Sequence, residues 1–76
     1  MVQIGNTHVR TADELGRALR SRRRELEISQ EALAAATGVN RRVIGELERG
    51  KGTVRLEIAL ALAEALGLDL ELRPRT

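Results

Sequence analysis

The segment QEALAAATGVNRRVIGELER, from Gln30 to Arg49, constrains the fold of this chain more than any other stretch. Apolar residues recur in it at helical spacing on both sides of Gly38, which predicts two short helices joined by a tight turn. Gly38 stands where the chain leaves the first helix with positive φ, which glycine adopts without steric cost. Asn40 is a suitable N-cap for the second helix, and the small Ala34 lets the two helices cross closely.

Two helices joined at a steep angle by a short, glycine-containing turn form the helix-turn-helix motif, whose second helix enters the DNA major groove. Two further helices are expected around this pair. Thr11 and Glu14 form a capping box before the first of them, and Gly67 stops the last. The four expected helices are residues 12–26, 30–37, 41–48 and 55–66.

The stretch from Leu68 to Arg73 changes from helical spacing to strict alternation, which predicts a β-strand. A single strand with an open edge tends to pair with another chain, so the simplest partner is the same strand of a second copy. Antiparallel pairing centred on Glu71 would set Asp69 opposite Arg73. The alternative partner is the N-terminal arm. The expected dimerisation residues are Leu68, Asp69, Leu70, Glu71, Leu72 and Arg73.

The chain therefore divides into three parts. Residues 1–10 are expected as an arm or a short strand, residues 11–67 as the helical domain, and residues 68–76 as the dimerisation strand and tail. A domain of this length buries only about 60% of its unfolded surface, which favours association with a partner.

Composition places the chain among soluble globular domains. It has 42% hydrophobic and 32% charged residues, a balance that argues against a disordered chain. Without cysteine it has no disulfide framework and no thiolate metal site. No signal peptide and no apolar run of transmembrane length is present, so a cytoplasmic protein is expected.

The net charge of +2 does not by itself indicate a nucleic-acid partner. Every cation except Lys51 is arginine, however, and arginine offers a planar fork of donors that suits phosphates and guanine edges. Acidic residues are interleaved with the arginines, so a solvated charged surface is an equal alternative on charge alone.

Five short motifs carry a family resemblance. They are LG-x-x-LR at residues 15–20, SQ-x-x-LA at 29–34, GVN at 38–40, ELERGK at 46–51 and ALGLDLEL at 65–72. Through them, residues 15–73 resemble the lambda-repressor-like (Xre) helix-turn-helix domain, and within it the HipB-type antitoxins. The resemblance implies a mostly α, four-helix domain whose C-terminal β-strand pairs across a homodimer. It also implies a structural ion pair between Arg23 and Glu48.

If the helix at residues 41–48 lies in the major groove, its first turn faces the base edges. Arg41 and Arg42 are the best candidates for guanine contacts, each worth about 1–3 kcal/mol of discrimination. Glu46 either accepts from cytosine or faces solvent, and the resemblance implies that Gln30 holds a phosphate or reads the first base. The other expected contacts are Val43 and, at phosphates, Asn40, Arg49, Lys51 and Arg55.

Gly45 departs from the family pattern, which has a polar side chain at that position. Either the backbone there comes close to DNA or to another helix, or the glycine is tolerated drift. A glycine within a helix costs about 1 kcal/mol relative to alanine.

No catalytic constellation is present. The segment from Gly45 to Lys51 fits the first part of a P-loop, but Gly52 stands where a P-loop needs Ser or Thr, and the segment is expected to be helical. His8 is the only histidine and is expected to be an exposed surface residue. We therefore expect no enzyme activity, no metal site and no cofactor.

Three functional hypotheses follow. The first is a dimeric repressor that binds a palindromic operator in double-stranded DNA and is also the antitoxin of a HipA-type kinase toxin, a partner that the resemblance implies. The second is a free-standing or phage-type repressor without a toxin. The third, from another class, is a protein-interaction module on a helix-turn-helix scaffold that binds no DNA.

Overall fold

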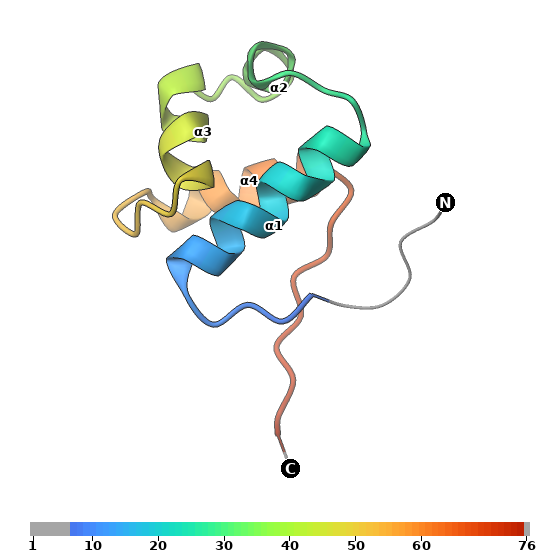
Figure 1. The fold of residues 1–76 in the computed structure, drawn as a ribbon, viewed down its shortest axis with the longest axis vertical. Helices are drawn as coiled ribbons and strands as arrows, with labels where there is room; N and C mark the ends of the chain where they lie inside the picture. Colours follow the sequence, from blue (N-terminus) through green and yellow to red (C-terminus); the bar gives the residue numbers. More distant parts are fainter. Residues whose placement is uncertain (1–6, 76) are drawn as a thin grey trace.

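The structure, a computed structural model, describes residues 7–75. It contains four helices, α1 (Ala12–Glu25), α2 (Gln30–Thr37), α3 (Arg41–Glu48) and α4 (Leu56–Ala65), followed by an extended tail (Figure 1). The four-helix arrangement agrees with the expected fold class. The expected helix at 12–26 ends one residue earlier, with Leu26 as its C-cap. The expected helix at 55–66 is shorter at both ends, with Arg55 and Leu66 as its caps.

The local signals at the helix ends are confirmed. Thr11 and Glu14 make both hydrogen bonds of a capping box at the start of α1. The Ser29 side chain accepts from the amide of Ala32 at the start of α2. Gly38 has φ +77° at the end of α2, and the chain turns there into α3.

The hydrophobic core lies where the four helices meet. Ile44 of α3, Leu62 of α4 and the α4 C-cap Leu66 are the largest fully buried side chains. Leu19, Leu33, Leu47, Ala59 and Ala63 complete the buried cluster. The outer face of α4 leaves Leu56 and Leu60 exposed, although both share the helical spacing of the buried residues.

Helices α1 and α3 cross in close contact at Gly16. This glycine is buried, and a Cβ atom built on it would overlap the carbonyl oxygen of Leu47. The absence of a side chain at Gly16 therefore allows the end of α3 to lie directly on α1, which fixes the angle at which α3 leaves the body of the molecule.

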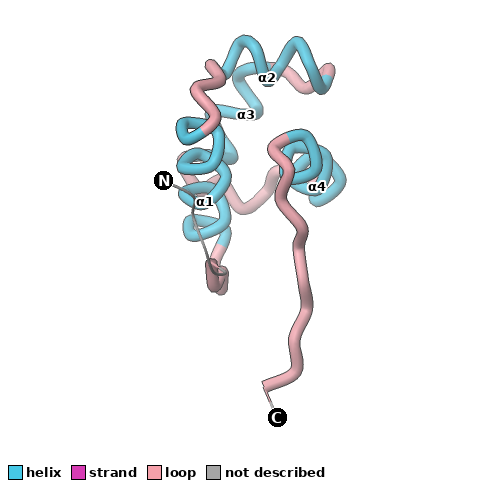
Figure 2. The backbone as a smooth tube through the Cα atoms, turned by 90° about the vertical axis from the view of Figure 1, so that its right-hand side faces the viewer, coloured by secondary structure: helices cyan, strands magenta, loops and turns pink. Residues whose placement is uncertain are grey.

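The tail after α4 projects away from the helices (Figure 2). The amide of Leu68 still donates to the carbonyl of Ala63 at 2.9 Å, after which the chain is extended. Within residues 7–75 the structure has no strand, so the segment from Leu68 to Arg73, predicted as a strand, is extended and pairs with no strand in that range. Pairing with a second copy stays a prediction. Residues 1–6 of the expected arm lie outside the described range.

Candidate nucleic-acid interface

The first turn of α3 presents two arginines to solvent. The Asn40 side chain accepts from the amide of Arg42 at 2.7 Å and so begins the helix. Ile44 and Leu47, on the opposite side of α3, are 0% and 3% exposed and anchor the helix in the core. As a result, the side chains of Arg41 and Arg42 stand on the outer side of the molecule.

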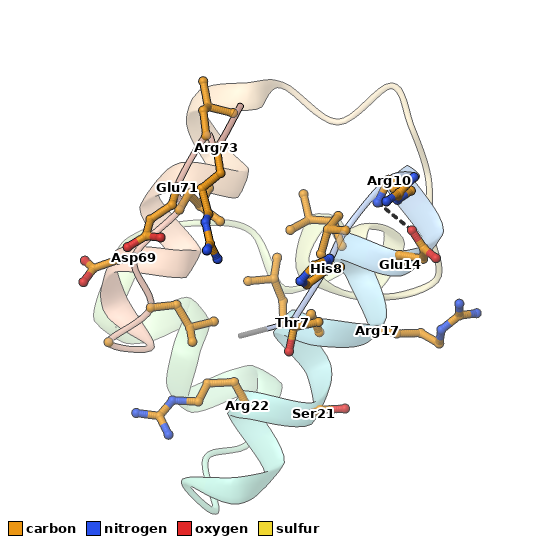
Figure 3. Close-up of a pocket in the computed structure, with 18 of the residues that line it drawn as sticks. Thr7, His8, Arg10, Glu14, Arg17, Ser21, Arg22, Asp69, Glu71 and Arg73 are labelled. Atoms are coloured by element: carbon orange, nitrogen blue, oxygen red, sulfur yellow. Dashed lines mark hydrogen bonds between the residues drawn. The ribbon is translucent and has the colours of Figure 1, made fainter. Parts of the chain in front are cut away.

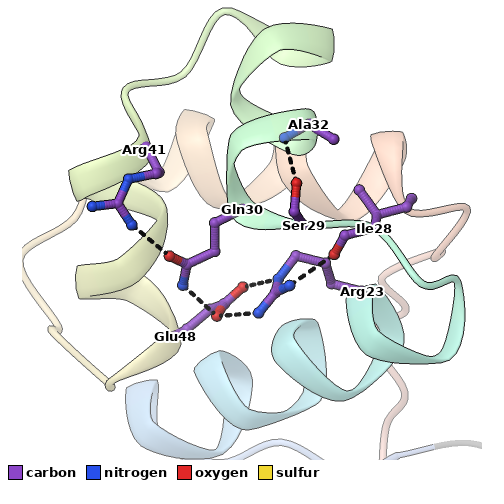
Figure 4. A network of polar contacts seen from close by, with 7 residues as sticks. All are labelled: Arg23, Ile28, Ser29, Gln30, Ala32, Arg41 and Glu48. Atoms are coloured by element: carbon purple, nitrogen blue, oxygen red, sulfur yellow. Dashed lines mark hydrogen bonds and ion pairs between the residues drawn. The ribbon is translucent and has the colours of Figure 1, made fainter.

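A chain of polar contacts links Arg41 to the core (Figure 4). Its Nη1 donates to Oε1 of Gln30 at 3.0 Å, and Nε2 of Gln30 donates to Oε1 of Glu48 at 2.9 Å. Because arginine can only donate and a carboxylate can only accept, these two partners fix which way the Gln30 amide points. The orientation of Gln30 is therefore set on both sides before any ligand arrives.

Glu48 ends this chain in a nearly buried ion pair with Arg23. Nε of Arg23 lies 2.6 Å from Oε2 of Glu48, and Nη2 lies 3.0 Å from Oε1, which is the bidentate geometry of a strong pair. The two side chains are only 11% and 6% exposed. Arg23 also donates to the carbonyl of Ile28 at 2.7 Å. The pair thus ties α1 to the end of α3 and to the segment that leads into α2.

The surroundings of Glu48 favour its charged form. Burial raises the pKa of Glu48, but hydrogen bonds from Arg23 and Gln30 and the charges of Arg23 and Arg20 outweigh burial, so this pKa lies below its ordinary value. The hydrogen bond with Glu48 raises the pKa of Arg23 above its ordinary value. Both groups are charged at neutral pH.

A second group of predicted contact residues gathers beside α3. The carboxylate of Glu46 lies 4.0 Å from Arg42 and 3.5 Å from Lys51, so two cations share it. Val43, Lys51 and Arg55 line one shallow hollow with Glu46. Arg55 pairs with Glu57 at 2.9 Å, and both of those side chains are largely exposed.

Arg49 caps the end of α3, but its guanidinium lies back along the helix. Nη1 of Arg49 is 3.3 Å from the position that a Cβ atom on Gly45 would take. The Gln30 amide lies 3.8–3.9 Å from the same position. Arg49, Gln30 and Arg41 therefore meet on one side of α3, around a gap that Gly45 leaves.

The predicted dimerisation residues line a different surface. An open groove lies between α1 and the tail, and Figure 3 shows Asp69, Glu71 and Arg73 on the tail side of it. Leu70 and Leu72 are 51% and 101% exposed, whereas Leu68 packs partly against the core. His8 lines the same groove and is exposed, as expected.

Within residues 7–75, no cluster of His, Cys, Asp or Glu could hold a metal ion, and no helix is both long enough and apolar enough to cross a bilayer. The GxxxxGK stretch is divided between α3 and the turn that follows it, without the preceding strand that a P-loop requires.

The sequence interpretation missed two features of this surface. It assigned Gln30 to DNA alone, although its amide also bonds to Glu48. It also left the role of Gly45 open, although Arg41, Gly45 and Arg49 follow one another at intervals of four residues and so share one side of α3. That spacing was a usable signal.

The chain belongs to the Xre-type helix-turn-helix family, because the family model described as Helix-turn-helix matches residues 19–72. It is thus a helix-turn-helix transcriptional regulator. The resemblance found in the sequence is confirmed.

Two relatives and two solved structures are similar to it. The "Uncharacterized HTH-type transcriptional regulator y4mF" of Sinorhizobium fredii is 31% identical over 64 residues, 84% of each chain. An uncharacterized HTH-type transcriptional regulator of Methanothermobacter thermautotrophicus is 43% identical over 51 residues, 67% of this chain and 74% of the relative. The structures titled "HipB-O4 20mer complex" and "Structure of HipA-HipB-O2-O3 complex" each match with a TM-score of 0.85. Each match covers 93% of this chain and all of the other, at 18% identity, which shows a shared fold.

Proposed function

We propose that this protein is a sequence-specific repressor that binds double-stranded DNA with α3 in the major groove. The observation that carries the proposal is the pair of exposed arginines, Arg41 and Arg42, in the first turn of the second helix of a helix-turn-helix. Residues at that position reach base edges in this class of motif, and arginine pairs with the O6 and N7 acceptors of guanine. No catalytic step is part of this function.

The remaining candidate residues have positioning roles in the proposal. Gln30 and Asn40 stand at the starts of α2 and α3, from which they reach the DNA backbone. Lys51 and Arg55 flank α3 and would contact phosphates. Val43 and Glu46 lie next to the arginines, and Glu46 is shared between Arg42 and Lys51, so its carboxylate can orient both cations.

The repressor is proposed to act as a homodimer in the cytoplasm, on a palindromic operator. The exposed Leu70 and Leu72, and an extended tail that pairs with no strand of residues 7–75, support association through residues 68–73. Two copies of α3 related by a two-fold axis would face half-sites about 34 Å apart, or a multiple of that distance.

A HipB-like antitoxin role is the finer proposal: the protein would repress its own operon and neutralise a HipA-type kinase toxin. Its support is the fold shared with HipB in complexes whose titles name a 20mer in one case and HipA in the other. A free-standing repressor uses the same DNA surface without a toxin. A protein-interaction module on the same scaffold is the alternative of another class.

Binding to the protein's own upstream promoter, compared with scrambled DNA over a salt series, tests the proposal. We expect a preference of about a thousandfold or more for the promoter. The double variant Arg41→Ala/Arg42→Ala should remove this preference while the fold is kept, because each guanine contact is worth about 1–3 kcal/mol. The double variant Arg10→Ala/Arg75→Ala, which removes two exposed charges away from α3, is the matched control. Equal, weak binding to both DNAs would reject the repressor in favour of the interaction module.

A search for a HipA-type kinase gene beside this gene, followed by co-purification with its product, separates the first two hypotheses. An antitoxin should form a stable complex with that kinase and suppress its activity. If no such kinase is encoded or bound while promoter binding is intact, the free-standing repressor is the better description.

A further inference from the structure

Two residues of α3 and its C-cap residue lie in one row along the side of α3 that faces Gln30. Arg41, Gly45 and Arg49 are spaced four residues apart, which places them on one face of a helix. The middle position has no side chain. The row therefore consists of two long cations separated by a gap.

Arg49 occupies this gap although its backbone is at the end of α3. A helical side chain leans toward the N-terminus of its helix, so Arg49 extends over the preceding turn. Its Nη1 atom is 3.3 Å from the place of a Cβ atom on Gly45, a distance at which a methyl group would push the guanidinium outward by a few tenths of an ångström. Within residues 7–75, Arg49 forms none of the ion pairs that engage its neighbours Arg42 and Lys51.

The Gln30 amide lies over the same gap from the side of α2. Its Nε2 and Oε1 atoms are 3.8 Å and 3.9 Å from the Cβ place on Gly45, and Oε1 accepts from Arg41. Two guanidinium groups thus flank one amide in the middle of the face that the proposed function turns toward DNA.

We propose that Arg49 is a specificity-determining residue that contacts a base edge, with guanine as the acceptor, and that Gly45 is the residue that makes room for it. This inference rests on the proposed function and changes one part of it, since the sequence alone suggested a phosphate contact for Arg49. A phosphate contact suits a side chain that leaves the end of a recognition helix outward. Arg49 instead extends back along α3 to Gly45, beside the Gln30 amide to which Arg41 donates, on the face that the proposed function turns toward base edges.

The first experiment selects operator sequences from a random DNA library with the wild-type protein and then measures binding to every single-base-pair variant of the selected site. Arg49→Ala should lose discrimination at one base pair by about fivefold to 150-fold and keep its preferences elsewhere. Arg49→Lys keeps the charge but loses the planar fork, so it should lose the same discrimination with an unchanged salt slope.

The second experiment uses Gly45→Ala, which adds one methyl group. The atom that it would crowd is the far end of a flexible side chain, so the thermal midpoint should stay or rise, because alanine favours a helix. Discrimination at the Arg49 base pair should nevertheless fall. In an Arg49→Ala background, Gly45→Ala should have no further effect at that base pair, because the group it displaces is already absent.

A phosphate role for Arg49 has a different signature. Arg49→Ala would then weaken binding equally at the selected site and at all of its variants, and the salt slope would fall by about one contact. That result, or full additivity of the Gly45 and Arg49 substitutions, overturns the inference but leaves the repressor proposal standing. A wild-type protein that enriches no sequence would overturn both.

Discussion

The carboxylate of Glu48 interacts with two residues, Arg23 in the core and Gln30 at the surface. It neutralises Arg23 in a nearly buried pair, and it holds the amide of Gln30 on the outer surface. Removing one partner of a buried pair leaves an uncompensated charge and costs about 3–5 kcal/mol, far more than the loss of an exposed pair. This single residue therefore contributes to the stability of the domain and to the geometry of its candidate contact surface.

We predict that Glu48→Gln lowers the free energy of unfolding by about 3–5 kcal/mol at pH 7 and flattens its pH dependence. The pKa of Glu48 is lowered on folding, so its contribution is fully present above its unfolded pKa of about 4.3 and is lost as pH falls through the folded value. Urea unfolding between pH 7 and pH 3 measures this: wild type and variant should converge at low pH. Glu25→Gln, in an exposed pair, is the control and should change stability by less than about 1 kcal/mol. A gap that stays constant with pH would contradict the prediction.

Individual residues were predictable from the sequence only in part. The caps at Thr11, Ser29 and Asn40 follow from local hydrogen bonding, which involves neighbours within three residues. The contact between Arg23 and Glu48 spans 25 positions, so only the family resemblance suggested it. The place of the Arg49 guanidinium depends on the empty position at Gly45, which the four-residue spacing could have indicated, and on a side-chain rotamer, which composition and hydrophobic periodicity do not encode.

At the scale of helices, the packing of α1 on α3 depends on the lack of a side chain at Gly16. Helix propensity alone favours alanine there by about 1 kcal/mol. The added methyl group would overlap a backbone carbonyl, which cannot move aside as a side chain can. Steric exclusion therefore outweighs propensity at this crossing.

We predict that Gly16→Ala lowers the free energy of unfolding by about 1–3 kcal/mol, as overpacking does in other cores. Gly52→Ala is the matched control, because its Cβ atom would meet only the Ala12 methyl group at an ordinary 3.6 Å. Its stability should stay within about 1 kcal/mol of wild type. Urea unfolding of both variants at one protein concentration makes the comparison, and equal midpoints would reject the close helix crossing as the cause.

The number and order of the helices could be predicted from periodicity and caps, with boundaries accurate to about one residue. Which face of α4 is exposed could not be predicted in this way. Leu56 and Leu60 share the helical spacing of Ala59 and Ala63, and only the packing of the rest of the chain against α4 decides which of these side chains are covered. Such a choice between two apolar faces is made by tertiary packing.

On the scale of the whole molecule, the tail after Gly67 is the part least supported by the chain itself. Leu70 and Leu72 are exposed. The tail alternates between apolar and polar residues as a strand does, but residues 7–75 contain no strand with which it could pair. The sequence predicted a β-strand for this segment, the structure shows it extended, and a second copy as its pairing partner stays a proposal.

We predict that Leu70→Lys/Leu72→Lys converts a homodimer to a monomer, with a dissociation constant raised at least about tenfold, because like charges and lost apolar burial both oppose strand pairing. Sedimentation equilibrium over a concentration series measures this. Removal of residues 74–76 is the control and should leave the dimer intact. A wild-type chain that is monomeric at every concentration would refute the proposed role of the tail.

The chain of contacts from Glu48 through Gln30 to Arg41 has a consequence in entropy. A long side chain that is free in solution and fixed in a complex costs about 0.5–1.5 kcal/mol of affinity. Arg41 is already restrained through Gln30 by a carboxylate in the core, so part of this loss accompanies folding and not binding. In the proposed DNA complex, the same set of contacts would then give tighter binding than a freely rotating arginine would give.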